Sequence, residues 1–474
     1  MLEKRTLIKD TPSKKNEEVT LYGWVNKIRD HGKVGFIDLR DTSGIIQVVF
    51  YGQNYKYIKE LGLEYVLKVV GKVKERNPNQ YNEKILTGKI EIDLLEIEIL
   101  NTSKELPIPL DTEGYNIEEE TRLKYRYVDL RRERMHKNII TRSKLTNAIR
   151  SELIKRDFVE VETPMLTKST KEGARDFIVP SRHHRGKFYA LPQSPQQYKQ
   201  LLMTAGVEKY FQIARCIRDE DLRADRGFEF TQVDLEMSFV SQEDVMKTTE
   251  SVIKNALANF NVKFKEDKFP IFTYEEAMKQ FGADKFDRRT EKEKKEGVLA
   301  FAWVIDFPFF KKVDKKDEAE KLDGKSGWTF THNPFSMPQK EHVNWLLEGK
   351  NIDSIKAYQY DLVCNGYEVG GGSIRAHKRE LLKATFRIMG YSDKEIEERV
   401  GHMLEAFELG TPPHGGIALG LDRLAMILTG EKNLKEVIPF PMTGRGKTAV
   451  MDAPSAVEKE LLKELGIKII KKDK

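Results

Sequence analysis

The sequence has few features of a secreted, membrane-bound or disulfide-built protein. Only two of its 474 residues are cysteines, Cys216 and Cys364, and neither has a second cysteine or a metal-ligand spacing near it. This argues against a disulfide framework and a zinc finger. No apolar run reaches the roughly 18 residues of a membrane span, and the N-terminus has no signal-peptide pattern. We therefore expect a soluble, cytoplasmic protein.

An excess of charge of one sign is also missing. The sequence has 81 Lys and Arg against 75 Asp and Glu, which leaves a formal net charge of only +6. This balance permits nucleic-acid binding through local basic patches but does not demand it. The composition is 39% hydrophobic and 33% charged. Such a chain is soluble, can bury a large core and is long enough for two or three domains.

Residues 19–101 have the pattern of a small β-barrel. Runs of β-branched or alternating residues predict five strands, and the polar residues 53–62 are a candidate helix. The predicted strands are residues 19–25, 34–39, 44–50, 65–73 and 89–95. Three strands, a helix and two strands are typical of an oligonucleotide-binding (OB) fold. A small barrel without a ligand gives the same pattern, so both interpretations stay open.

One face of this barrel would carry side chains suited to single-stranded nucleic acid. An aromatic ring can stack on an unpaired base while polar groups recognise its edges. Residues of these types fall on or beside the first three predicted strands: Arg29, His31, Lys33, Phe36 and Gln47. Each alone is an ordinary surface or core residue, but their combination predicts nucleic-acid binding.

A stiff linker follows the barrel. Residues 101–109 include two prolines, and Gly114 comes soon after. We expect three parts, namely a barrel domain at 1–103, a hinge or linker at 104–130 and a second domain at 131–474. Inside the second domain, residues 285–297 are highly charged and predict a solvated connection.

The most informative stretch lies near the middle of the chain. Residues 218–226 are densely charged, and residues 229–236 alternate between polar and apolar, which predicts a half-buried strand. Gln232, Asp234 and Glu236 would then share one face of that strand. That face could hold a cationic or polyphosphate ligand. A solvated surface hairpin is the alternative.

Two glycine-rich segments add further candidates. Residues 365–375 contain Glu368 and three consecutive glycines, and residues 415–424 lead an apolar strand into a helix with Arg423 at the junction. A buried arginine needs an anionic partner, and a triphosphate suits its planar donors. Asp361 and Glu368, both placed on the strand before the glycines, could share Mg²⁺ with phosphate oxygens. No P-loop occurs. Structural salt bridges are the alternative for each charged residue.

The order of these motifs resembles bacterial-type aspartyl-tRNA synthetases, a family of class II aminoacyl-tRNA synthetases. The resemblance covers almost the whole chain. Its motifs are Glu172–Asp176 (EGARD), Leu191–Gln196 (LPQSPQ), Arg218–Arg226 (RDEDLRADR), Gly366–Gly372 (GYEVGGG) and Gly420–Arg423 (GLDR). The resemblance implies an α+β protein with an N-terminal OB-fold barrel and a class II catalytic domain, an antiparallel sheet flanked by helices.

The family's reaction implies ATP, Mg²⁺, L-aspartate and tRNA(Asp) as ligands, and a homodimer. Aspartate and ATP would form aspartyl-adenylate, and the terminal ribose of the tRNA would take the aspartyl group. The residues implied at the catalytic and ATP site are Arg218, Asp219, Glu220, Phe230, Glu368, Gly420, Leu421, Asp422 and Arg423. Those implied for aspartate are Glu172, Gln196, Lys199, Arg218, Asp234, His332 and Arg375, and those for Mg²⁺ are Asp361 and Glu368.

The resemblance also implies how the tRNA is recognised. Arg29, Phe36, Gln47 and Glu91 match the family's anticodon-reading positions. With a histidine at position 31, the sequence resembles family members that also charge tRNA(Asn) and leave an amidotransferase to convert the product. Asn79, in a neighbouring barrel loop, could share this effect on tRNA choice. A surface histidine without such a role is the alternative.

The chain departs from the family pattern in three other places. Gly227 stands where a glutamine commonly contacts ATP, and His332 is followed by Asn333 instead of a second histidine. Residues 262–300 leave no room for the large inserted domain of bacterial members. The ATP contact at Gly227 is therefore in doubt, and we expect that the inserted domain has been lost.

Two other functions fit parts of the sequence. A non-catalytic paralogue could bind RNA through the barrel, and an asparagine-forming enzyme could use the same catalytic fold. The presence of Arg218, Glu368 and Arg423 argues against the first, and the barrel argues against the second.

Overall fold

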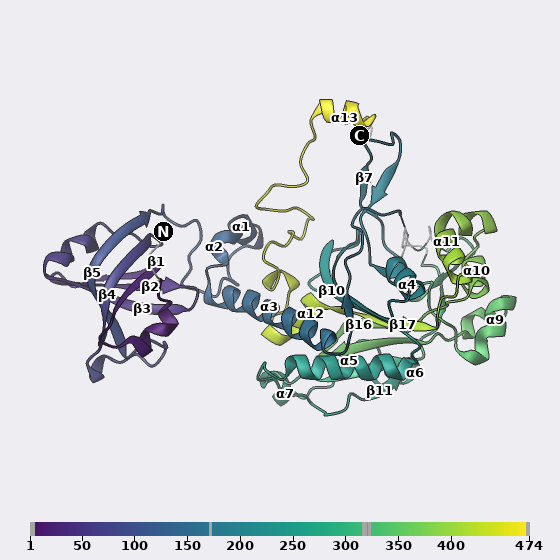
Figure 1. Cartoon of the computed structure of the whole chain (residues 1–474), viewed down its shortest axis with the longest axis horizontal. Helices are drawn as coiled ribbons and strands as arrows, with labels where there is room; N and C mark the ends of the chain where they lie inside the picture. Colours follow the sequence, from purple (N-terminus) through teal and green to yellow (C-terminus); the bar gives the residue numbers. More distant parts are fainter. Residues whose placement is uncertain (1–4, 170–172, 315–319, 321–323, 471–474) are drawn as a thin grey trace. The chain divides into compact units, whose positions relative to one another are not determined.

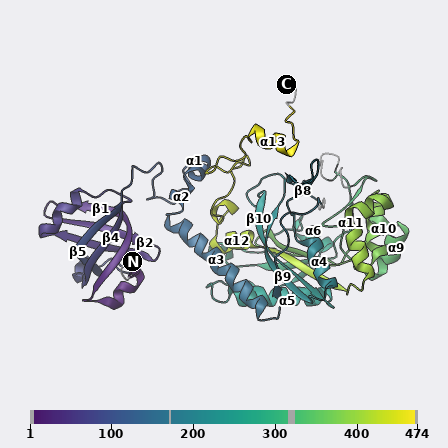
Figure 2. The same cartoon turned by 45° about the horizontal axis from the view of Figure 1, so that its top comes forward.

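The computed structural model describes residues 5–169, 173–314, 320 and 324–470. The chain divides into two compact units, Met1–Pro109 and Leu110–Lys474, drawn in Figures 1 and 2. Within the described residues, no helix is both long enough and apolar enough to span a membrane.

The first unit is a closed barrel of five strands in the order β1-β2-β3-β5-β4. The strands are β1 (Glu18–Asp30), β2 (Val34–Asp41), β3 (Gly44–Tyr51), β4 (Val66–Glu75) and β5 (Ile90–Asn101). Three short 3-10 helices accompany them: η1 (Ile8–Lys14), η2 (Gly52–Lys59) and η3 (Pro78–Gln80). The predicted OB fold is confirmed, and the candidate helix after the third strand is η2.

Alternation along β2 shows how the sequence builds a barrel with two different surfaces. Ile37 and Leu39 are fully buried in the barrel core, whereas Phe36 and Asp38 between them are only half-buried. Because successive side chains of a strand point to opposite faces, Phe36 and Asp38 lie together on the outer surface.

The second unit is built on an eight-stranded sheet of order β11-β12-β15-β16-β17-β10-β9-β6. Its strands are β6 (Val159–Glu160), β9 (Lys209–Ile217), β10 (Glu229–Ser238), β11 (Ile271–Thr273), β12 (Phe301–Ile305), β15 (Gln359–Cys364), β16 (Tyr367–Ile374) and β17 (His414–Gly420). The central pairs are antiparallel, while the edge strands β11 and β6 run parallel to their neighbours. The hairpins β7 (Ile178–Pro180) with β8 (Phe188–Ala190) and β13 (Phe310–Lys312) with β14 (Trp328–Phe330) stand apart from it. The predicted α+β class is confirmed.

Helices cover one face of this sheet and leave the other for polar residues. The covering helices are α3 (Glu133–Ile154), α5 (Gln242–Leu257) and α12 (Leu421–Thr429) (Figure 1). Val233 and Leu235 of β10 are buried in the core beneath them. Since side chains alternate along a strand, Gln232, Asp234 and Glu236 point to the opposite face. That face carries the candidate site.

The remaining helices are shorter or lie outside the main core. They are α1 (Glu119–Lys124), α2 (Arg126–Asp129), α4 (Gln196–Thr204), α6 (Tyr274–Phe281), α7 (Glu291–Lys295), η4 (Lys340–His342), α9 (Val343–Glu348), η5 (Ile352–Ser354), α10 (Arg379–Ile388), α11 (Asp393–Glu408), η6 (Leu434–Glu436) and α13 (Lys459–Leu465). Helices α9, α10 and α11 gather around a second apolar core at one end of the unit (Figures 1 and 2).

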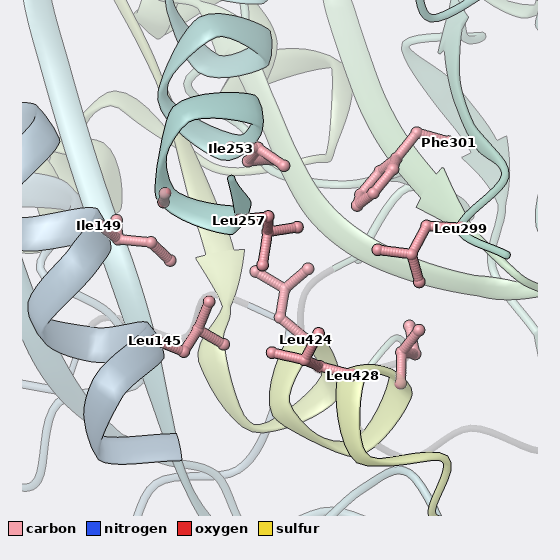
Figure 3. Close-up of a pocket in the computed structure, with 10 residues that line it drawn as sticks. Leu145, Ile149, Ile253, Leu257, Leu299, Phe301, Leu424 and Leu428 are labelled. Carbon is pink, nitrogen blue, oxygen red and sulfur yellow. The ribbon is translucent and has the colours of Figure 1, made fainter. Parts of the chain in front are cut away.

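The main core contains one small gap, shown in Figure 3, where α3, α5 and α12 meet the segment leading into β12. It encloses about 10 Å³ and is lined only by apolar residues, among them Leu145, Ile253, Leu299 and Leu424. An ordered water needs two or more polar partners, which this lining does not offer. The gap is therefore a packing imperfection and not a ligand site.

A network of buried ion pairs joins the start of the second unit to a segment far along the chain. Arg122 Nη2 lies 2.9 Å from Asp129 Oδ2 and 2.9 Å from Glu436 Oε2. Arg134 Nη1 lies 2.6 Å from Glu431 Oε1 and 2.9 Å from Glu436 Oε2. Because each charge has a partner at hydrogen-bond distance, the cost of burying it is offset. The network fixes the segment around η6 against α1 and α3.

Candidate active site

A pocket of about 160 Å³ opens where β10, β16 and β17 meet the start of α12. Its lining brings together most of the predicted catalytic and ATP-binding residues: Arg218, Glu220, Phe230, Glu368, Gly420, Asp422 and Arg423. Gly227 also lines it. The pocket therefore collects residues from three separate sequence motifs.

Arg218 and Phe230 form one wall of this pocket. The guanidinium carbon of Arg218 lies 5.0 Å from the centre of the Phe230 ring. The Arg218 Nε donates a hydrogen bond of 3.2 Å to the carbonyl of Gln193, which orients the side chain. A cation beside an aromatic face offers both surfaces that a purine nucleotide needs.

Arg423 also lines the pocket and is held in place by backbone and side-chain acceptors. Its Nη1 donates to the carbonyl of Glu368 at 2.8 Å, and its Nη2 lies 3.2 Å from Asp225 Oδ2. These contacts tie the first turn of α12 to β16 and to the charged segment before β10. Leu434 joins the same wall, because its N–H donates to the carbonyl of Ala224 at 3.0 Å.

Two predicted ATP-site residues do not line the pocket, and a third also serves as its support. Leu421 is fully buried in the apolar core, and the Asp219 N–H donates to the carbonyl of Arg175 at 3.0 Å. Asp422 accepts the Thr231 N–H at 2.8 Å and lies 2.8 Å from Arg142 Nη2. Asp422 therefore anchors the pocket wall from behind as well as lining it.

A buried cluster of four charges lies further along the same face of β10. Lys199 Nζ, on α4, lies 2.5 Å from Asp234 Oδ1 and 3.0 Å from Glu236 Oε2. Arg375 pairs with both oxygens of Glu236, through Nε at 2.8 Å and Nη2 at 3.1 Å, and its Nη1 donates to Ser373 Oγ at 2.7 Å. None of the four charged side chains is more than 2% exposed.

Glu236 is the member of this cluster that the sequence did not identify as a site residue. It shares one carboxylate between Lys199 and Arg375, so the two cations are already balanced by two carboxylates. Gly416 makes room for it, since a Cβ there would lie 2.1 Å from Glu236 Oε2. Strand alternation placed Glu236 on the correct face, but its pairing with Arg375 joins residues 139 positions apart.

Burial and pairing set opposite proton affinities for the two carboxyls. Burial raises the pKa of Asp234, although Lys199 opposes the shift. Burial also works against ionisation of Glu236, but the charges of Arg375 and Lys199 outweigh it and lower its pKa to about 2. Burial lowers the pKa of the neighbouring His414 to about 4, so this imidazole is neutral at pH 7. Glu236 is therefore the firmly ionised partner of both cations.

Asp361 and Glu368 lie on neighbouring strands, β15 and β16, and not on one strand as the sequence suggested. A Cβ on Gly371 would lie 3.2 Å from Asp361 Oδ1 and 3.4 Å from Glu368 Oε1. Both carboxylates therefore border the same small space, which the glycine keeps open. Burial and the charge of Glu368 raise the pKa of Asp361, whereas Lys285 and Arg423 overcome burial and lower that of Glu368.

The prediction that residues 285–297 form a solvated connection holds for the second half of the segment but not for the first. No side chain of α7 is buried, whereas residues 285–289 are all at least partly buried. Phe286 is 6% exposed and stacks on Phe281 with ring centres 4.0 Å apart. Arg288 pairs with Glu266 at 2.6 Å, and Lys285 pairs with Glu368 at 2.6 Å. Charge density alone predicted exposure, but Lys285 and Arg288 have partners from other segments.

Two other candidates for the aspartate site have buried polar atoms without a hydrogen-bond partner. His332 Nδ1 lies 3.8 Å from Asp361 Oδ2, and its Nε2 is buried without a hydrogen-bond partner. Gln196 begins α4 and is 9% exposed, with its Nε2 also buried and unpartnered. These two polar atoms are available to a ligand. Glu172 lies outside the described residues.

The outer face of the barrel carries a separate polar array. Arg29 pairs with both oxygens of Asp38, at 3.0 and 2.7 Å, and its Nη2 donates to Gln47 Oε1 at 3.0 Å. The Gln47 Nε2 donates in turn to Glu91 Oε2 at 2.8 Å. Three of the four predicted anticodon-reading residues therefore form one continuous array.

The aromatic part of the predicted anticodon surface is present as well. The exposed His31 meets Phe36 edge to face, with ring centres 5.8 Å apart. Asn79 lies in η3 and is exposed. The shared role of Asn79 and His31 in tRNA discrimination stays a prediction.

Known protein families match both units. The family of class II tRNA synthetases (D, K and N) matches residues 118–444, and the family of OB-fold nucleic acid binding domains matches residues 19–100. The chain belongs to the class II tRNA synthetases. Among curated members of this family, the aspartate–tRNA(Asp/Asn) ligase of Pelagibacter ubique is 38% identical, with 96% of this chain and 97% of that protein covered.

Other curated aspartate–tRNA ligases match this chain to a similar extent. The aspartate–tRNA(Asp/Asn) ligase of Caldanaerobacter subterraneus subsp. tengcongensis is 40% identical, with 96% of each chain covered. The aspartate–tRNA ligase of Staphylococcus saprophyticus is 38% identical, with 97% of this chain and 98% of that protein covered. The match with the Pelagibacter protein runs over 588 positions, more than the 474 residues of this chain, so that relative carries sequence that this chain lacks.

Solved synthetase structures share the fold. Asparaginyl-tRNA synthetase from Pyrococcus horikoshii, in complex with asparaginyl-adenylate, superposes with a TM-score of 0.73 at 22% identity, covering 93% of this chain and 99% of that one. Aspartyl-tRNA synthetase from Entamoeba histolytica gives a TM-score of 0.72 at 20% identity, covering 92% and 91%.

Proposed function

We propose that this synthetase attaches L-aspartate to tRNA(Asp) in an ATP-dependent reaction with two steps. The observation that carries the proposal is the arrangement along β10. Gln232 lines the nucleotide pocket, and the next two residues on the same strand face, Asp234 and Glu236, hold the buried cations. A phosphate-binding pocket and a carboxylate-binding cluster therefore lie side by side.

The first step joins the α-carboxylate of aspartate to the α-phosphate of ATP, and pyrophosphate leaves. Arg218 and Arg423 stabilise the charge that develops on the phosphates, and Phe230 stacks on the adenine. In the second step a hydroxyl of the terminal tRNA ribose attacks the activated carbonyl, and AMP leaves. No protein nucleophile takes part, so positioning and charge stabilisation supply the catalysis.

Lys199 and Arg375 select the aspartate side chain. Their donors suit a carboxylate, whereas the amide of asparagine would turn N–H groups towards other donors. Asp234 and Glu236 keep both cations fixed while they are buried. His332 and Gln196 have unpartnered nitrogen atoms that can contact the other end of the amino acid.

Mg²⁺ fits between Asp361 and Glu368, whose carboxylates converge on the space beside Gly371. Among the residues that the structure describes, no group of three or more His, Cys, Asp and Glu side chains could hold a metal alone. Mg²⁺ commonly takes one or two carboxylates and completes its shell with phosphate oxygens and water. When bound, it would supply positive charge to the phosphates of ATP.

The barrel recognises the anticodon, and tRNA(Asn) is a second substrate. Phe36 offers a ring for base stacking, and Arg29, Gln47 and Glu91 offer polar groups that can recognise base edges. Support for the second tRNA comes from His31 and from relatives named aspartate–tRNA(Asp/Asn) ligase. An amidotransferase would then have to convert the aspartyl group on tRNA(Asn) to asparaginyl.

The protein acts as a homodimer through the region around Pro164. The short β6 is an edge strand of the sheet, and apolar side chains near it are exposed: Ile154 by 54%, Val159 by 53%, Met165 by 42% and Leu166 by 52%. Exposed apolar residues beside a sheet edge are suited to an interface with a second copy. Sedimentation at micromolar concentration should show a dimer, and a monomer alone would contradict this assignment.

Pyrophosphate exchange tests the proposed activity. Radiolabelled pyrophosphate should enter ATP when aspartate is present but not when asparagine or lysine replaces it. No exchange with aspartate would reject the enzymatic function and favour a non-catalytic RNA-binding protein. Charging of purified tRNA(Asp) and tRNA(Asn) then separates the two tRNA specificities, since a discriminating enzyme would leave tRNA(Asn) uncharged.

A further inference from the structure

A lysine outside the family motifs contacts the proposed metal site. Lys285 lies between α6 and α7, and its Nζ is 2.6 Å from Glu368 Oε2. The two side chains are 35% and 25% exposed, so the pair lies near the surface of the site and not in the deep core. The same carboxylate is one of the two that border the space beside Gly371.

The backbone around Lys285 is fixed by its neighbours, so the position of Lys285 beside Glu368 is set by the fold. Phe286 is buried in an aromatic group with Phe281 and Phe272, and its carbonyl accepts the N–H of Gly366 at 3.0 Å. Gly366 begins the turn into β16, two residues before Glu368. The connection is therefore hydrogen-bonded to the hairpin that carries both proposed metal ligands.

The ammonium and a metal ion would compete for one carboxylate. Two cations that share Glu368 repel each other, and water weakens this repulsion at a partly exposed site without removing it. With Lys285 in its observed position, the carboxylate is neutralised before any metal arrives. When a divalent cation enters together with ATP, the phosphate oxygens can coordinate the cation and can also pair with the Lys285 ammonium.

We propose that Lys285 is a displaceable counter-ion of Glu368. It holds this carboxylate in place while the site has no nucleotide, and it weakens binding of a divalent cation until ATP supplies phosphate oxygens. On metal binding its Nζ leaves Glu368 and pairs with phosphate. Lys285 is thus a positioning residue that links metal entry to nucleotide entry, and this role rests on the proposed metal site.

The test measures cation binding without any turnover. Mn²⁺ serves as the probe, and its free concentration is followed by electron paramagnetic resonance with the full-length protein in the absence of ATP. Lys285→Met keeps most of the side-chain length but removes the charge, so Mn²⁺ should bind about tenfold more tightly. Lys285→Arg should bind Mn²⁺ as weakly as the unsubstituted chain.

A matched control removes a similar lysine away from the site. Lys265 belongs to the same region and pairs with Glu293 at 2.7 Å. Lys265→Met should leave Mn²⁺ affinity unchanged. With ATP present, the tenfold difference between Lys285→Met and the unsubstituted chain should shrink, because phosphate then supplies metal ligands to both. Lys285→Gln replaces Lys285→Met if the latter does not fold.

Three results would overturn the inference. Unchanged Mn²⁺ affinity in a folded Lys285→Met or Lys285→Gln protein would show that the lysine does not compete. Weaker Mn²⁺ binding in these variants would show that it supports the metal. Unchanged Mn²⁺ binding in Glu368→Gln would show that Glu368 is not a ligand of the metal. Each result is independent of pyrophosphate exchange, so failure of the inference and failure of the proposed enzymatic function remain distinguishable.

Discussion

The two units use charge in opposite ways. On the barrel, Arg29 and Asp38 keep 32% and 20% of their side chains exposed, so their pair can open and exchange partners with a nucleic acid. In the catalytic unit, Lys199, Asp234 and Glu236 are at most 2% exposed. A buried cluster cannot rearrange cheaply, which suits selection of one small ligand. We propose that this difference in exposure separates a surface that binds a macromolecule from a site that selects an amino acid.

Removal of a phosphate-binding cation should give the largest effect and leave the barrel untouched. Arg423→Ala should slow pyrophosphate exchange at least a thousandfold, about 4 kcal/mol, because a fixed donor to the phosphates is lost. Binding of tRNA, measured by filter retention, should stay near normal. Arg387→Ala removes an exposed arginine paired with Asp393 and is the matched control. Near-normal exchange in Arg423→Ala would refute its role.

A neutral substitution inside the buried cluster comes next. Glu236→Gln leaves Lys199 and Arg375 with a single carboxylate, which should destabilise the catalytic unit by about 3 kcal/mol. Thermal unfolding can be followed by the fluorescence of Trp303, Trp328 and Trp345, all in this unit. The control is Glu397→Gln, which removes a carboxylate paired with Arg379 that is 43% exposed. Equal melting temperatures for both variants would break the contrast between buried and exposed charge.

Low pH should destabilise the protein through the buried His414 but not through the exposed His31. The pKa of the buried His414 is depressed to about 4, so below the unfolded value near 6.5 the unfolded chain binds a proton that the folded chain does not. Stability should therefore fall as the pH drops from 6.5 to 4, by roughly 2 kcal/mol at pH 5.

His414→Asn should reduce this loss, measured as the difference in unfolding free energy between pH 7 and pH 5. The exposed barrel histidine provides the control, His31→Asn, which should lose stability as the unsubstituted chain does. An unaltered pH dependence in His414→Asn would contradict the assignment.

The smallest effect is expected on the barrel. Arg29→Ala should weaken tRNA binding about tenfold, because one set of hydrogen bonds is lost from a surface that water can reach. Aspartate-dependent pyrophosphate exchange should not change. Lys15→Ala, which breaks an exposed pair with Glu75 on the same unit, is the control. Slower exchange in Arg29→Ala would show that the two units are not functionally separable.

Local patterns explain how much of the fold the sequence predicted. The barrel strands alternate regularly, so their existence and their positions along the chain followed from periodicity. Glu368 and Arg423 were identified because glycines and apolar strands surround them. The parallel pairings of β6 with β9 and of β11 with β12 could not be predicted, because β6 and β11 are only two and three residues long.

The missed features depend on partners far along the chain. Glu236 needs Arg375, and Lys285 needs Glu368, and both pairs form only after separate strands and loops have been brought together. A charged segment gives no sign of such a partner, so Lys285 was predicted to be solvated. Leu421 lies within a family motif, but it is buried in the core. A motif match alone does not separate contact from support.

The ion-pair network around Arg122 has a consequence for the order in which the protein is made. Arg122 donates to Glu436, which is 314 positions later in the sequence. A ribosome delivers the cations of this network long before it delivers Glu431 and Glu436. All strands of the barrel are synthesised early, so the barrel can fold first. In the second unit, α1 and α3 cannot form their ion pairs with Glu431 and Glu436 until nearly the whole chain has emerged.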